Sequence, residues 1–382
     1  MKRWKQVSAF CLAAVLSASG TTAAWAGSPE FARTAGEWAQ LRDNTMEYGE
    51  LAGLIREYNV TVQTNRLDLS DKKNDDLVTR DEYAQYYRDA ADDARSAIVG
   101  DDDTAVADAG LAVAARQAEE QADKNTMDLD VYRITYDQAE ANLVAGAQTA
   151  MISYFQQQYQ LESAKSSLEL LNTVYDSAVV RKNAGMATQV DVLTALENVQ
   201  NAQTSVDKLT SSIEETRQKL CIMLGWKYND TPEIKEIPAV DMDKIAAMNP
   251  ETDKEAALTN NYTLNINKKK LENATADITK QTLATTISSN EQNIGKDLSN
   301  NYQSVLHARA SYDQAVAEYN LEVKNMAAAD RKNQVGTISR LEYQKQKNAY
   351  ETKSIAVKTA ELTLFQAVQT YENAVGGLAS GG

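Results

Sequence analysis

The sequence predicts an all-α protein made of long antiparallel helical hairpins in two related halves. Its four prolines, Pro29, Pro232, Pro238 and Pro250, leave two long proline-free blocks. Such blocks, rich in Ala, Gln, Glu, Lys and Leu, favour helix. Each block also contains one glycine-centred turn of the same pattern. Strands are expected to be rare, because apolar and polar residues seldom alternate.

The amino terminus is typical of a secretory signal segment. Three basic residues precede a short apolar run, and Ala24 and Ala26 fit a small-x-small cleavage site. The apolar run is too short for a membrane anchor. We therefore exclude residues 1–26 from the fold and expect an exported protein.

Charge and cysteine content narrow the possible functions. The net charge is −15, and removal of the signal segment with its three cations gives −18. This charge argues against a nucleic acid partner. Without Cys11, Cys221 is alone, so no intrachain disulfide can form, and we expect a buried, inert thiol.

Catalytic chemistry is not indicated. His307 is the only histidine, and the sequence lacks paired cysteines, phosphate-binding glycine loops and hydrolase motifs. We expect no enzymatic activity, no cofactor and no metal. A calcium loop beginning at Asp101 would need Gly at its sixth position and Glu at its twelfth, which are Val106 and Ala112. A solvated acidic segment is the preferred interpretation.

Helical spacing of apolar residues gives the elements in order. In the first half we expect a helix over 37–66, an acidic irregular segment over 67–104, a continuous helix over 128–182 and another over 189–224. After a connector, we expect helices over 251–285, 296–332 and 339–374, with a short polar connection at 288–295. Apolar steps of three and four predict coiled-coil packing. The predicted domains are a signal peptide (1–26), a first repeat (27–231) with an acidic insert (67–127), a linker (232–250), a second repeat (251–375) and a flexible tail (376–382).

The two turns share the pattern G-x-x-[ST]-x-[VL]-[DE]. The first reads RKNAGMATQVDVL from residue 181, and the second reads RKNQVGTISRLEY from residue 331. When Gly185 is aligned with Gly336, Thr188 meets Ser339. Glycine can end a helix in the left-handed conformation, and Thr or Ser followed three residues later by an acid forms a capping box. Two such helical reversals indicate an internal duplication.

This combination resembles the TolC family of efflux and secretion exit ducts. The family's reversals carry a V-G-x-x-x-x-x-D-V-L-like pattern. Gly185 with Val190-Asp191-Val192-Leu193 matches it well, and Val335-Gly336 with Leu341-Glu342 matches it more loosely. In the family, each half also inserts a pair of membrane strands. Here the corresponding segments, 288–295 and 67–127, are short and polar or acidic, so we expect a member without these strands.

The resemblance implies a function and partners. Three chains would form a hollow helical tube in the cell envelope, at the outer membrane in the family. Its narrow tip would dock the hairpin of a membrane-fusion adaptor tied to an inner-membrane pump. The residues implied at the docking tip are Gly185, Met186, Ala187, Thr188, Asp191, Gly336, Thr337, Ile338, Ser339 and Glu342. The alternative is an exported coiled-coil scaffold that binds a partner and conducts nothing.

Overall fold

The structure, a computed structural model, describes residues 28–381, so the predicted signal segment lies outside the described residues. Apart from one pair of two-residue strands, its regular elements are helices, as predicted. The first half contains α1 (Ala35–Leu41), β1 (Thr45–Met46), α2 (Leu51–Tyr58), α3 (Val60–Asn74), α4 (Arg80–Ser96), α5 (Ala105–Lys124), α6 (Leu129–Asn183) and α7 (Gln189–Met223). The rest contains β2 (Glu233–Ile234), α8 (Met242–Ala247), α9 (Pro250–Asn260), α10 (Tyr262–Asn273), α11 (Asp277–Gln334) and α12 (Arg340–Asn373).

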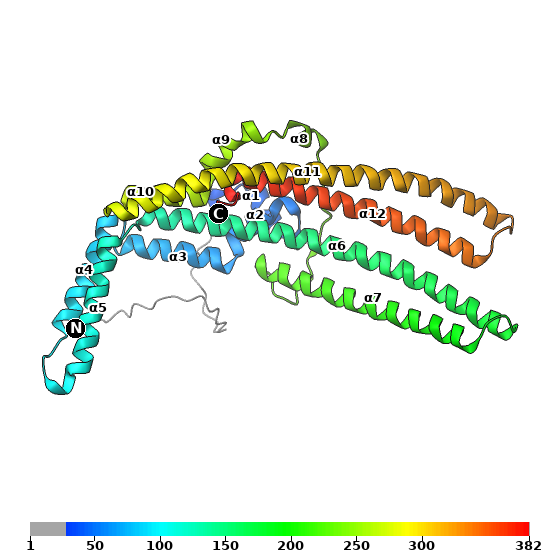
Figure 1. Cartoon of the computed structure of the whole chain (residues 1–382), viewed down its shortest axis with the longest axis horizontal. Coiled ribbons are helices and arrows are strands. Elements are labelled where there is room, and N and C mark those ends of the chain that lie inside the picture. The colour runs from blue at the N-terminus through cyan, green and yellow to red at the C-terminus, as the bar shows by residue number, and fades with distance from the viewer. Residues whose placement is uncertain (1–27, 382) are drawn as a thin grey trace.

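Two long hairpins form the body of the molecule. Helix α6 has 55 residues and is therefore about 80 Å long. It reverses into α7, and α11 reverses into α12. Helix α7 packs on α6, α6 packs on α12, and α12 packs on α11, so the four helices form one layer with α7 and α11 on opposite sides (Figure 1).

Polar contacts join the two hairpins between α6 and α12. The amide of Asn348 donates to Ser166 Oγ at 2.8 Å. Lys347 pairs with Glu169 at 3.2 Å, and Ser166 also bonds Glu351. The seam between the hairpins is thus partly hydrophilic along this stretch.

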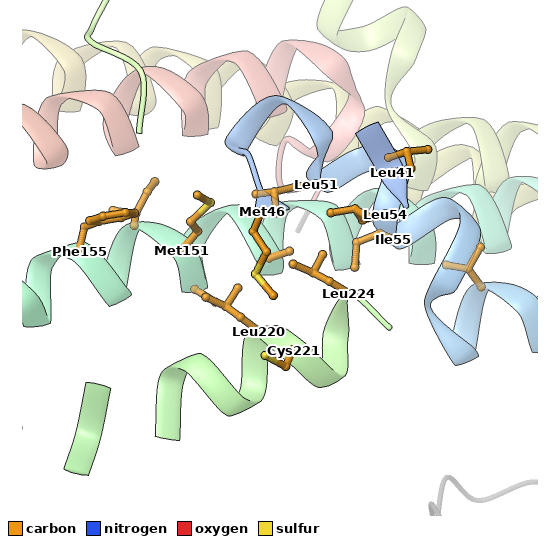
Figure 2. Close-up of a cluster of buried hydrophobic side chains, with 14 of the residues drawn as sticks. Leu41, Met46, Leu51, Leu54, Ile55, Met151, Phe155, Leu220, Cys221 and Leu224 are labelled. Carbon is orange, nitrogen blue, oxygen red and sulfur yellow. The ribbon is translucent and has the colours of Figure 1, made fainter. Parts of the chain in front are cut away.

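The main hydrophobic core lies where the amino-terminal segment crosses α6 and the end of α7. Figure 2 shows the side chains of these three segments pointing toward one another. The central residues of this core are fully buried: Met46, Leu51, Leu54, Ile55, Met151, Leu220, Cys221 and Leu224. Burial raises the pKa of the Cys221 thiol, which agrees with the expectation of a buried thiol.

The predicted continuous helix over 37–66 is wrong. The segment is divided into α1, α2 and α3, and β1 lies between the first two and pairs in parallel with β2. Asn59 separates α2 from α3. Its side-chain oxygen accepts from the amides of Thr61 and Val62, and its Nδ2 donates to the Met223 carbonyl at 2.9 Å. A local cap and a tertiary contact of the same asparagine therefore set this break, and apolar spacing alone could not reveal it.

The acidic segment over 67–104 is largely helical rather than irregular. Helix α3 continues to Asn74, and α4 follows after a short turn. Thr79 caps α4 through a complete capping box with Glu82. Helices α4 and α5 form a hairpin, which we call the arm, and the arm bends away from the long bundle (Figure 1).

The second half also differs from prediction before its long hairpin. The expected helix over 251–285 is divided into α9, α10 and the start of α11, and the expected connection at 288–295 lies inside α11. Asn261 makes the break between α9 and α10, since its side chain accepts from the Leu264 amide. Ile294 is fully buried, which explains why this polar stretch remains helical.

The predicted flexible tail is wrong over its described part. Ala374–Leu378 continues α12 as a π-helical turn, and Ala379 is buried. The amide of Asn261 donates to the carbonyls of Gly377 and Ala379, at 3.2 and 2.8 Å. The Ser380 amide donates to Asp297 at 2.9 Å. These contacts hold in place a glycine-rich segment whose composition alone suggests conformational flexibility.

The two halves repeat this arrangement more closely than the turns alone indicate. In each, an asparagine at a break between two short helices bonds the backbone that ends the long hairpin: Asn59 with Met223, and Asn261 with Gly377. Each ending also has a glycine with positive φ, at Gly225 and Gly377. The duplication therefore includes the short helices α2, α3, α9 and α10. Within residues 28–381, every helix is too short or too polar to cross a lipid bilayer.

Candidate docking tip

Both predicted reversals are present and share one backbone geometry. Gly185 and Gly336 each have φ +72° just beyond a helix end, as predicted. The Gly185 amide donates to the Lys182 carbonyl at 2.9 Å, and the Met186 amide donates to that of Arg181 at 2.8 Å. The second turn repeats both bonds from Gly336 and Thr337. This is the Schellman arrangement, which satisfies the last carbonyls of a helix.

Each following helix begins with the expected capping box. Thr188 Oγ1 accepts from the Asp191 amide, and the Asp191 carboxylate accepts from the Thr188 amide at 2.7 Å. Ser339 and Glu342 repeat this pair. The backbone bond from the capping residue, followed by its hydroxyl bond, lowers the pKa of each carboxyl. These carboxylates therefore hold the turns in shape and remain ionised at neutral pH.

The apolar surface of the tip differs in one respect from prediction. Docking through Met186 and Ile338 requires both side chains to be exposed, but only Met186 is, at 65%, whereas Ile338 is partly exposed. The prominent apolar side chain of the second turn is Val335, at 72% exposure. Val335 directly precedes Gly336, as Ala184 directly precedes Gly185. Alignment of the two turns could therefore have identified Val335 as a tip residue. Ala187 is partly exposed, and Thr337 is exposed.

The two reversals lie at the same end of the molecule, at the far end of the long helices from the arm (Figure 1). The tip is also locally basic in an acidic chain. Arg181, Arg331, Lys332 and Arg340 are exposed there. Met186 and these arginines suit contact with another protein, because methionine and arginine are enriched at protein interfaces. Among residues 28–381 no group of three or more His, Cys, Asp or Glu side chains is placed to hold a metal ion.

Removing one cap should loosen one reversal. We expect Thr188→Ala or Ser339→Ala to lower local stability by about 1 kcal/mol, because an amide in the first helical turn loses its acceptor. Hydrogen exchange at the Asp191 and Glu342 amides measures the effect, and each change should accelerate exchange only in its own turn. Thr210→Ala is the matched control, since Thr210 bonds the Val206 carbonyl within α7. Unchanged exchange in the capping variants would contradict the assigned role.

Comparison with known proteins gives structural relatives only. No protein-family model matches the chain, and no curated protein matches it significantly. Among solved structures, the outer-membrane channel OprN matches with a TM-score of 0.55 and 13% identity, covering 95% of this chain and 99% of that one. The CmeC outer membrane channel of Campylobacter jejuni matches with a TM-score of 0.57 and 9% identity, covering 95% and 94%.

The outer membrane protein VceC of Vibrio cholerae also matches, with a TM-score of 0.53 and 11% identity over 89% of this chain and 96% of that one. At such identities the likeness concerns the fold, and it spans nearly the whole of both chains. The paired hairpins, the two equivalent reversals and these matches agree with one another. The chain therefore has the helical fold of the TolC-family outer membrane channels.

Proposed function

We propose that this chain is the exit duct of a tripartite efflux or type I secretion system. Three copies form a helical tube in the cell envelope, and the two reversals of each copy dock a membrane-fusion adaptor linked to an inner-membrane pump. One observation carries this proposal: two capped reversals of equal geometry lie at the same end of a four-helix layer.

The shape of the layer supports assembly into a tube. Helices α7 and α11 lie on its opposite sides, so the α7 side of one copy can meet the α11 side of the next. Both sides retain exposed apolar residues, for example Leu193 at 53% and Leu321 at 60%. A contact between unlike surfaces closes into a ring when the rotation between copies fits.

The tip variants Met186→Glu and Val335→Glu test the proposal in the organism that carries the gene. We expect the double variant to reproduce the deletion phenotype, because two carboxylates are placed where a partner must pack. Ethidium accumulation in cells measures efflux, and protein released into the medium measures secretion. Tyr228→Glu is the control, since Tyr228 is equally accessible at 61% but lies in the connector after α7.

Cellular abundance and helicity should match the parent in all variants. Normal efflux and secretion by the double variant would overturn adaptor docking at the tip. Native mass spectrometry tests the ring separately, and three copies are expected. A purified chain that remains monomeric would overturn the duct and leave the exported scaffold as the better interpretation.

A further inference from the structure

The arm is a large departure from the internal repeat. In the second half, three residues (274–276) connect α10 to α11, whereas in the first half the arm separates α3 from α6. Contacts tie the base of the arm to the bundle. The Arg80 guanidinium donates to Thr275 Oγ1 at 3.3 Å, and the Tyr83 ring stacks on Tyr132 with centroids 5.6 Å apart. Beyond its base, the arm consists of two helices that pack on each other.

The arm has a thin core and an uncovered apolar face. Apart from Tyr83, its buried side chains are alanines: Ala84, Ala91, Ala115 and Ala122. Larger apolar side chains point outward, with Val106 at 91% exposure and Val113 at 55%. These two residues are two helical turns apart on one side of α5, and Ala109 and Gly110 lie between them. This face has no partner within the described chain.

The arm is also strongly acidic. Residues 80–124 contain twelve Asp and Glu against five Arg and Lys. In the described chain, no ion pair neutralises Asp93 or the run of three aspartates that starts at Asp101. Anionic lipid would be repelled by this charge. A partner surface must therefore combine apolar and basic groups.

Such a surface exists on this protein, at the same end of the molecule as the arm (Figure 1). Residues 262–280, which comprise α10 and the start of α11, contain four lysines against two carboxylates. The side chains of Lys270 and Lys280 form no ion pair within residues 28–381. Ile278, in the first turn of α11, is 71% exposed. Within the described chain, the hydrogen bonds between the arm and this region lie at the base of the arm, at Arg80 and Asp123.

The direction of the arm decides which copy it can reach. Figure 1 shows the arm leaving the layer on the side of α3 and α7, opposite α10 and α11. We propose that the arm packs on α10 and the first turns of α11 of a second copy, with the Val106 face of α5 near Ile278 and the arm's carboxylates near Lys270 and Lys280. This inference rests on the ring of copies in the proposed function.

Photo-crosslinking tests the contact directly. The full chain carrying p-benzoylphenylalanine at Val106 is purified, irradiated and separated on a denaturing gel. We expect a band of two-chain mass whose crosslinked peptide maps to residues 262–290. The probe at Asp93, an exposed residue of α4, is the matched control and should give less of this adduct. Equal yields at both sites, or adducts that map elsewhere, would overturn the proposal.

Assembly gives a second, independent readout. The double variant Val106→Asp and Val113→Asp should raise the concentration for half-assembly at least tenfold by mass photometry, with an unchanged circular dichroism spectrum. Tyr228→Asp should leave it unchanged. A stable ring that the double variant does not weaken would refute the arm contact and leave the duct intact, whereas a monomeric parent would refute both. Flotation with phosphatidylcholine vesicles that requires Val106 would assign the face to a membrane instead.

Discussion

Replacing Gly225 with alanine is expected to destabilise the protein far more than the same change at Gly185. Both residues have positive φ, so each alanine costs about 1–2 kcal/mol of backbone strain. A Cβ at Gly185 meets nothing within 4 Å, but a Cβ at Gly225 would overlap Tyr58 Cβ and lie 3.3 Å from the Tyr58 carbonyl. Overpacking of this kind adds about 1–3 kcal/mol.

Thermal and denaturant melts of the two variants measure this difference. Gly377→Ala should resemble Gly225→Ala, since its Cβ would lie 2.5 Å from the Asn260 carbonyl, and Gly336→Ala should resemble Gly185→Ala. Equal losses of stability at all four positions would mean that Gly225 and Gly377 do not pack against Tyr58 and Asn260 as described.

Removal of Arg33 should cost much more stability than removal of Arg42. Both guanidiniums lie over the Trp38 ring, at 5.7 and 4.6 Å. Arg33 pairs at 2.9 Å with Glu57, whose side chain is 2% exposed, whereas Arg42 pairs with the 70% exposed Glu30. We expect Arg33→Ala to cost about 3 kcal/mol, because it leaves a buried carboxylate without its cation, held only by the Ser28 bonds. Arg42→Ala should cost little, because the Arg42–Glu30 pair is exposed to water and screened.

The pH dependence provides a second check on the same pair. Burial raises the pKa of Glu57, but hydrogen bonds from Ser28 and Arg33 more than offset it, so the pKa lies below its ordinary value. The parent therefore holds this stability above the unfolded-state pKa and loses it as pH falls through the folded-state pKa. In Arg33→Ala only the Ser28 bonds oppose burial, so the pKa of Glu57 should be higher than in the parent, and acidification should destabilise the variant less than the parent. An equal loss of stability in parent and variant on acidification would contradict this account.

The sequence predicts the long helices and their reversals because the determinants are local. Gly185 and Gly336 set the helix ends, and Thr188 and Ser339 cap the next helices through neighbours three residues away. The same residues place most of the candidate tip. Val335 was recognised as part of the second reversal but was not among the expected docking residues, because it carries no capping signal and its exposure depends on how the turn is oriented.

The breaks between the short helices were missed because the prediction followed apolar periodicity alone. Asn59 and Asn261 cap the next helix locally, and each also bonds backbone far along the chain. The apolar periodicity over 37–66 or 251–285 contains no trace of these distant partners. The tail was misassigned for the same reason. Its glycines suggest freedom, while Asn260 and Asn261 supply the surface that fixes them.

The paired asparagine contacts also set an order of folding for a chain made from its amino terminus. Asn59 is separated from its Met223 partner by 164 residues, and Asn261 from Ala379 by 118. The nascent α2–α3 segment must therefore wait for all of α6 and α7 before its core can close, and α9–α10 must wait for α11 and α12. Contacts between residues so far apart in sequence slow folding, and apolar surface stays exposed to water until they form. The Asn59–Met223 contact can nevertheless form before the second half is synthesised, and Leu362 and Phe365 of α12 complete this core afterwards, so the duplication divides one slow reaction into two successive steps.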